Sequence, residues 1–171
     1  MHVTLISPGL IHQKGDPFGG IPAMPSGLAY LAGWLRHKGI SVTLIDAYGE
    51  APLKAASFRE KYIVRGLSLD EIIERIPAET DLVGVGVHSG SQHHRSLEVI
   101  NAIKESLGLP IVVGGHHPTI LYREFLQKGA DYVILNEGEV GLEKLCYALQ
   151  GQITFEEVPS LAWRGGGPNP Q

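Results

Sequence analysis

The sequence predicts an α/β fold in which helices cover a parallel sheet. Short apolar runs recur along the chain and are separated by helix-length amphipathic stretches, an alternation typical of βαβ units. The two central runs, 82–87 and 111–113, are almost continuously apolar, as parallel strands buried on both faces are. We therefore expect five parallel strands, at residues 2–7, 41–46, 82–88, 110–114 and 131–135.

The stretches between these runs have a helical period. Apolar residues lie three or four positions apart in three stripes: Leu28, Leu31, Ala32 and Leu35; Leu69, Ile72, Ile73 and Ile76; Leu97, Ile100, Ile103 and Leu107. Ser68 and Glu71 predict a capping box at the start of the second helix. Gly39, Gly108 and Gly129 follow helical segments, where a left-handed residue ends a helix.

The connections predict how these elements assemble. We expect a Rossmann-like (flavodoxin-like), doubly wound, five-stranded parallel sheet of order 2-1-3-4-5 over residues 1–150. Residues 47–67 carry no clear pattern, and residues 151–171, with Pro159 and a Gly-rich end, are predicted to be an extended linker. Ligands of such folds bind outside the carboxyl ends of the strands.

Composition excludes several classes of protein. Fourteen Lys and Arg against eighteen Asp and Glu give a net charge of −4, which argues against a nucleic-acid partner. The first residues lack a signal-peptide pattern and no apolar run has membrane-spanning length, so a cytoplasmic protein without a membrane partner is expected. Cys146 is the only cysteine and shares a helical stripe with Leu142, Leu145 and Leu149, which predicts a buried core thiol.

Five segments, in chain order, carry a family resemblance: 22–32, 81–87, 114–119, 131–139 and 158–164. They are similar to the cobalamin-binding domain that precedes the catalytic barrel in many B12-dependent radical SAM enzymes. The Gly-Gly-His-His-Pro-Thr run at 114–119 resembles the turn Gly-Gly-x-His-x-Thr of that family. Asn136 replaces the first glycine of its Gly-Glu-Gly-Glu run.

The resemblance implies cobalamin as the cofactor and a domain that binds but does not catalyse. The radical SAM barrel needs a Cys-x3-Cys-x2-Cys motif, which a chain with one cysteine cannot contain. S-adenosylmethionine, a [4Fe-4S] cluster and a methyl-transfer or related radical reaction are therefore expected only in a full-length enzyme. The implied partner is a radical SAM catalytic domain, in cis or in trans. The substrate stays undetermined.

Candidate cofactor-binding residues lie in the loops at the carboxyl edge of the predicted sheet. The first loop, 8–26, is longer than a connection requires, which indicates a binding loop. Gly114 and Gly115 would let the nucleotide tail of cobalamin pass beside the strands, or would serve a turn with positive φ. For Gly84 we favour helix packing, and for Gly86 ligand approach. The candidates are Pro8, Gly9, His12, Gly86, His88, Ser89, Ser91, Gly114, Gly115, His116, His117, Asn136, Glu137 and Gly138.

His12 is a separate question. Residues 10–15 retain His12 and Gly15 of the Asp-x-His-x-x-Gly motif that supplies the lower cobalt ligand in the methionine-synthase type of B12 domain. Leu10 replaces the aspartate that would orient the imidazole, and the following helix is expected only from about Pro25. An ordinary loop histidine is therefore favoured over an axial ligand.

Two alternatives remain beside cobalamin binding. His88, His93, His94, His116 and His117 fall on two neighbouring loops, which suits a His-based metal site. His93 and His94 are, however, expected to start a helix and to point apart, and no carboxylate recurs at ligand spacing among them. The other alternative is a flavodoxin-like module for a nucleotide or flavin, or an interaction domain without a ligand. Gly-x-Gly-x-x-Gly is missing after the first strand, which counts against a dinucleotide.

Overall fold

A computed structural model of the chain describes residues 1–16 and 24–171. Its main sheet contains five parallel strands, β1 (His2–Ser7), β3 (Ser41–Asp46), β6 (Leu82–Gly86), β7 (Ile111–Gly114) and β8 (Tyr132–Ile134). They coincide with the five predicted strands and stand in the order β3-β1-β6-β7-β8, which is the predicted 2-1-3-4-5. A sixth strand, β9 (Leu161–Trp163), joins antiparallel to β8 and was not predicted.

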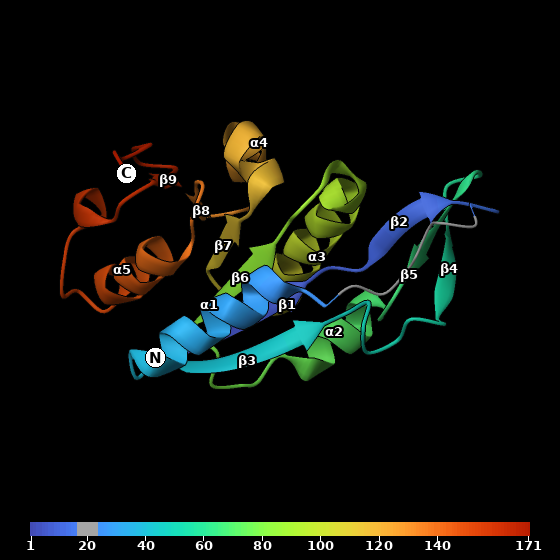
Figure 1. Cartoon of the computed structure of the whole chain (residues 1–171), viewed down its shortest axis with the longest axis horizontal. Coiled ribbons are helices and arrows are strands. Elements are labelled where there is room, and N and C mark those ends of the chain that lie inside the picture. Colours follow the sequence, from blue (N-terminus) through green and yellow to red (C-terminus); the bar gives the residue numbers. More distant parts are fainter. Residues whose placement is uncertain (17–23) are drawn as a thin grey trace.

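Helices cover both faces of this sheet (Figure 1). One core cluster joins α1 (Ser26–His37) and α5 (Glu139–Leu149) to one face through residues such as Leu35, Leu145, Leu5 and Val112. The other cluster joins α2 (Leu69–Arg75), α3 (His93–Ser106) and α4 (His116–Gln127) to the opposite face. The doubly wound α/β architecture is therefore confirmed.

Local signals in the sequence also match the structure. Ser68 and Glu71 form the predicted capping box of α2. Gly39, Gly108 and Gly129 have φ angles of 76°, 64° and 119°, as expected where a left-handed residue ends a helix. Cys146 is fully buried, and burial raises the pKa of its thiol to about 12, which leaves an inert core residue.

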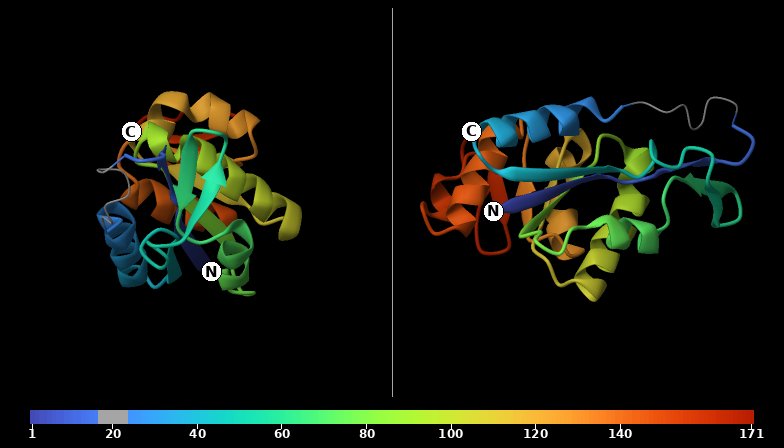
Figure 2. Two further views of the ribbon diagram at one scale, coloured as in Figure 1. Left: turned by 90° about the vertical axis from the view of Figure 1, so that its right-hand side faces the viewer. Right: turned by 90° about the horizontal axis from the view of Figure 1, so that it is seen from below.

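A small antiparallel sheet extends beyond the carboxyl ends of the main strands (Figure 2). It consists of β2 (Leu10–Gln13), β5 (Tyr62–Arg65) and β4 (Ala55–Phe58), in the order β2-β5-β4. Residues 47–67, which had no clear pattern, thus contribute a hairpin that pairs with part of the predicted binding loop. Residues 17–23 of that loop, and with them the first residues of the 22–32 motif, lie outside the described residues.

The segment 151–171 differs from the predicted extended linker. After the 3₁₀ turn η2 (Phe155–Glu157), Val158 and Leu161 are fully buried and β9 pairs with β8. The Asn169 side chain donates hydrogen bonds to the carbonyl oxygens of Phe155 and Val158. These residues are therefore not an extended linker. Glycines and prolines, which usually indicate a loop, flank the three residues of β9, so the sequence pattern did not reveal this short edge strand.

Among the residues that the structure describes, no helix has both the length and the hydrophobicity needed to cross a bilayer.

Candidate functional site

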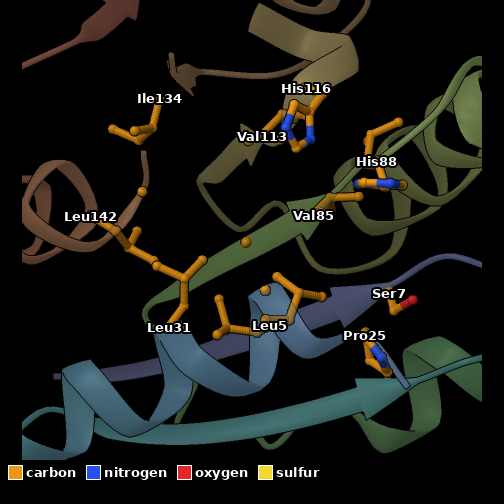
Figure 3. A pocket seen from close by; sticks show the side chains of 18 of the residues that line it. Leu5, Ser7, Pro25, Leu31, Val85, His88, Val113, His116, Ile134 and Leu142 are labelled. Atoms are coloured by element: carbon orange, nitrogen blue, oxygen red, sulfur yellow. The ribbon is translucent and has the colours of Figure 1, made fainter. Parts of the chain in front are cut away.

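A cavity of about 560 Å³ opens at the carboxyl edge of the main sheet and reaches down between α1 and α5 (Figure 3). Its floor is formed by β1, β6 and β7, and its sides by residues such as Leu31 of α1 and Leu142 of α5. This is the edge at which doubly wound folds bind ligands. The volume lies in the usual range of ligand pockets.

Glycines on one face of the central strands create this space. Side chains alternate across a strand, so Gly84 and Gly86 share the face that looks toward α1 and α5, while Val83 and Val85 pack into the opposite core. Gly86 pairs with Gly114 of β7, which extends the strip without side chains to the next strand. The cavity therefore follows from the pattern Val-Gly-Val-Gly of β6 and from the end of β7.

Each glycine of this strip has a different neighbour. A Cβ atom on Gly84 would lie 2.7 Å from the Leu5 side chain, and one on Gly86 would lie 2.9 Å from the Leu28 side chain of α1. The preference for helix packing at Gly84 is thus corrected, because α1 packs on Gly86; ligand approach at Gly86 stays a prediction. A Cβ atom on Gly114 would meet only the Ile134 carbonyl oxygen, at 3.7 Å.

Gly115 has a conformational role instead. Its φ is 113°, and a Cβ atom would lie 2.5 Å from the Val87 carbonyl oxygen. The Thr119 hydroxyl donates to the Gly115 carbonyl oxygen over 3.0 Å and accepts from the Asn136 backbone amide over 2.9 Å. These contacts fasten the loop after β7 to the loop after β8.

Polar side chains gather at the mouth of the cavity. The rings of His88 and His116 meet edge to face, with their centroids 5.1 Å apart, and both residues are exposed. The His88 backbone amide donates to Gln92 Oε1 over 2.9 Å, which holds the loop after β6 in place. Donors and acceptors therefore surround an opening whose interior is apolar.

Nine of the fourteen candidate residues line this cavity: Gly86, His88, Ser89, Gly114, Gly115, His116, Asn136, Glu137 and Gly138. Of the other five, Ser91 lies on the same loop as Ser89, and their hydroxyl oxygens are 2.7 Å apart. Pro8 and Gly9 do not line the cavity and are buried. A Cβ atom on Gly9 would lie 2.4 Å from the Arg65 carbonyl oxygen.

His12 and His117 are not among the residues that line the cavity. His12 belongs to β2, and its Nε2 accepts a hydrogen bond from Arg65 Nε over 3.0 Å. His117 lies on the side of α4 that packs against α3, with its Nε2 3.0 Å from His93 Nδ1. The structure thus separates both residues from the site in which the sequence grouped them.

The histidines of α3 and α4 form their own cluster. His93 Nε2 lies 3.3 Å from Glu124 Oε1, and the His93 ring contacts the ring of His94 with a centroid distance of 5.3 Å. The expectation that His93 and His94 point apart is therefore wrong. Burial lowers the pKa of His117, and the neighbouring His93 adds to this effect, whereas Glu124 opposes it. Among the described residues, no group of three or more His, Cys, Asp or Glu could hold a metal ion.

Sequence reasoning missed most of the apolar wall of the cavity. Leu5, Leu28, Leu31, Ile134 and Leu142 all line it, although each was predicted only as part of a strand or a helix stripe, or not singled out at all. The available signal was the pair Gly84 and Gly86, which share one face of a strand. Ser7 was missed as well, because it does not stand out in its segment.

Comparisons with known proteins agree with this geometry. The family described as B12 binding domain matches residues 21–146. The anaerobic magnesium-protoporphyrin IX monomethyl ester cyclase of Synechocystis is 31% identical over 146 residues, which is 82% of this chain and 26% of that protein. The chain thus spans about a quarter of the length of this curated relative.

Solved structures show the same fold. The cobalamin-dependent S-adenosylmethionine radical enzyme OxsB, with aqua-cobalamin bound, superposes with a TM-score of 0.74 at 20% identity over 97% of this chain and 21% of that one. The radical S-adenosylmethionine methyltransferase TsrM of Kitasatospora setae gives a TM-score of 0.72 at 20% identity over 99% of this chain and 30% of that one.

The fold and the cavity define a ligand-binding α/β domain. The chain belongs to the B12-binding domain family, and the expected resemblance to the cobalamin-binding domains of radical SAM enzymes is confirmed. Cobalamin is accordingly its cofactor.

The residues present fit this cofactor. The tail of cobalamin needs a deep slot, and Gly84, Gly86 and Gly114 leave one beside the strands. The corrin ring is broad and apolar with amides at its rim, which suits an apolar opening with polar side chains around it. His88, His116 and Asn136 supply such groups at the mouth.

Proposed function

We propose that the cavity between α1, α5 and the glycine face of β6 and β7 holds the nucleotide tail of cobalamin, and that the loops at its mouth contact the corrin ring. The observation that carries this proposal is the strip formed by Gly84, Gly86 and Gly114, which opens the face of a buried sheet without breaking its strands. The Leu5 and Leu28 side chains pack on Gly84 and Gly86, whereas Gly114 meets only the Ile134 carbonyl oxygen, at 3.7 Å, so a ligand group can approach the backbone closely at this strand end.

Each part of the site has its own task in this proposal. Leu5, Leu31 and Leu142 exclude water from the tail, since they form the apolar sides of the cavity. Gly114 leaves room at the strand end, and Gly115, with Thr119 and Asn136, fixes the loops beside it. His88, Ser89, His116 and Asn136 offer hydrogen bonds at the mouth. Cobalamin supplies the methyl-transfer or radical chemistry when bound.

The whole protein is proposed to be a B12-dependent radical SAM enzyme of the methyltransferase type or a related one. S-adenosylmethionine and a [4Fe-4S] cluster would be held by a catalytic domain, in cis or in trans, that faces the corrin ring. Support comes from the similarity of the fold to OxsB and TsrM, which are S-adenosylmethionine radical enzymes. The cytoplasmic location stays a prediction, as does the lack of nucleic-acid and membrane partners.

The test combines ligand retention with one matched pair of variants. The protein is incubated with hydroxocobalamin and passed through gel filtration, and the absorbance spectrum of the protein peak reports retained corrin. Gly114→Leu places a side chain in the slot without a backbone clash, so we expect the Kd for cobalamin to rise by about ten-fold or more. Gly33→Leu, on an exposed part of α1 with open space around it, is the control.

Circular dichroism and thermal unfolding must show that both variants are folded. A colourless wild-type protein would contradict cobalamin binding altogether. A folded Gly114→Leu variant with the wild-type Kd would contradict the placement of the tail, while leaving cobalamin binding intact.

A further inference from the structure

Below its mouth, the cavity is enclosed by hydrocarbon side chains and glycine. Leu5, Val112 and Ile134 come from the sheet, Leu28 and Leu31 from α1, and Leu142 from α5. The polar side chains among the described lining residues sit at strand ends or on the loops and helix starts that follow them, from Ser7 to Glu139. The deep part of the cavity therefore offers no polar side chain from the described part of the chain.

In the described part of the chain, the main chain at this depth offers no free group either. β6 lies between β1 and β7, where Gly84 is paired with Leu5 on one side and with Val112 on the other. Backbone amides and carbonyls of a central strand are used by its neighbours. Those of α1 and α5 beyond the first turn of each helix are used inside the helices. A ligand group that reaches this depth would gain dispersion contacts but no hydrogen bonds.

Cobamides share one corrin ring and differ in the base at the end of the nucleotide tail. In cobalamin this base is 5,6-dimethylbenzimidazole, whose far edge consists of ring carbons and two methyl groups. In an adenine-bearing cobamide the same position carries an exocyclic amino group and additional ring nitrogens. Polar groups that are buried without a partner lose their bonds to water and regain none.

Resting on the proposed function, we infer that this cavity selects cobamides by their lower base, and that it favours dimethylbenzimidazole over adenine. The residues that set the preference are the leucines of the two helices, Leu31 of α1 and Leu142 of α5, which both line the slot (Figure 3). The unpartnered groups of adenine weaken binding by about ten-fold or more, which corresponds to about 1.4 kcal/mol.

The experiment compares two ligands on the same protein. Dissociation constants for aqua-cobalamin and for the corresponding adenine-bearing cobamide are measured by ultrafiltration, with free corrin quantified by absorbance. The expected result is a Kd for the adenine compound at least about ten-fold higher. Equal constants would overturn the selection while leaving the proposed function in place. Failure to retain either compound would instead overturn the proposed function and the inference together.

A matched pair of variants tests whether the leucines that line the slot cause the preference for dimethylbenzimidazole. Leu31→Gln places a carboxamide in the slot at a half-buried position, so the ratio of the two constants should fall several-fold toward one. Leu53→Gln makes the same change at a side chain that is 89% exposed and does not line the cavity, and the ratio should stay at its wild-type value. If Leu31→Gln is poorly folded, Leu28→Gln replaces it. A wild-type ratio in a folded wall variant would overturn the assignment.

Discussion

The Thr119 hydroxyl accepts a hydrogen bond from the Asn136 backbone amide over 2.9 Å, and so joins the loops that follow two adjacent parallel strands. The same hydroxyl donates to the Gly115 carbonyl oxygen one turn earlier in α4. Asn136 has a φ of 59°, a conformation that asparagine tolerates better than most residues. One side chain thus sets the relative position of two segments that border the cavity.

Replacing this hydroxyl should loosen both loops. Thr119→Val keeps the shape of the side chain but leaves the Asn136 amide without its partner, so the free energy of unfolding should fall by about 1 kcal/mol. Urea unfolding measures this change, and Thr119→Ser, which retains the hydroxyl, serves as the control. A loss in Thr119→Ser with none in Thr119→Val would show that the methyl group, not the hydrogen bond, matters.

Gly115→Ala should destabilise the fold more than the same change at another left-handed glycine. Gly115 combines a φ of 113° with a predicted Cβ contact of 2.5 Å to the Val87 carbonyl oxygen, so we expect a loss of about 2–3 kcal/mol. Gly108 has a φ of 64° and open space around it, so Gly108→Ala should cost only about 1 kcal/mol. Chemical denaturation of both variants checks this, and similar losses would refute a steric role for Val87.

His12→Ala should leave cobalamin binding unchanged, within about two-fold in Kd. His12 lies on β2, away from the residues that line the cavity, and its Nε2 accepts a hydrogen bond from Arg65. His12 is therefore not expected to ligate cobalt from below. The EPR spectrum of bound cob(II)alamin tests this: a nitrogen splitting that disappears in His12→Ala would establish His12 as the ligand.

The stability of the protein should decrease as the pH falls below about 6.5, the ordinary pKa of histidine. Burial lowers the pKa of His117 in the folded state, so the unfolded state binds the proton first and protonation favours unfolding. The destabilisation caused by His117 is absent above the pKa of this histidine in the unfolded state. It is complete only below its pKa in the folded state. His117→Gln should therefore lose less stability between pH 7.5 and pH 5 than the wild type.

Denaturant unfolding at the two pH values gives the comparison. His37→Gln, which makes the same substitution at an exposed histidine at the end of α1, is the control variant. An identical pH dependence in His117→Gln would mean that the environment of this imidazole does not affect stability.

The sequence predicted the main sheet because local patterns are sufficient for it. Buried parallel strands are continuous apolar runs and helices carry apolar stripes, so the five strands followed from runs such as 82–87 and 111–113, and their order from the usual connections of doubly wound folds. The small sheet was not predicted, because β2, β4 and β5 are four residues each and partly exposed. The edge strand β9 was hidden by the glycines and prolines around it.

The candidate site divides in a similar way. Motif segments in the sequence determined the family and most residues of the cavity mouth, since loops that follow parallel strands meet at one edge of the sheet. Only the tertiary structure decided which loop residues face the cavity: it directed His88 and His116 toward it, and His12 and His117 elsewhere. It also decided that Leu31 and Leu142, from two helices that are far apart in the sequence, line the same slot. Such contacts depend on how helices pack across the sheet, which periodicity along a single segment does not specify.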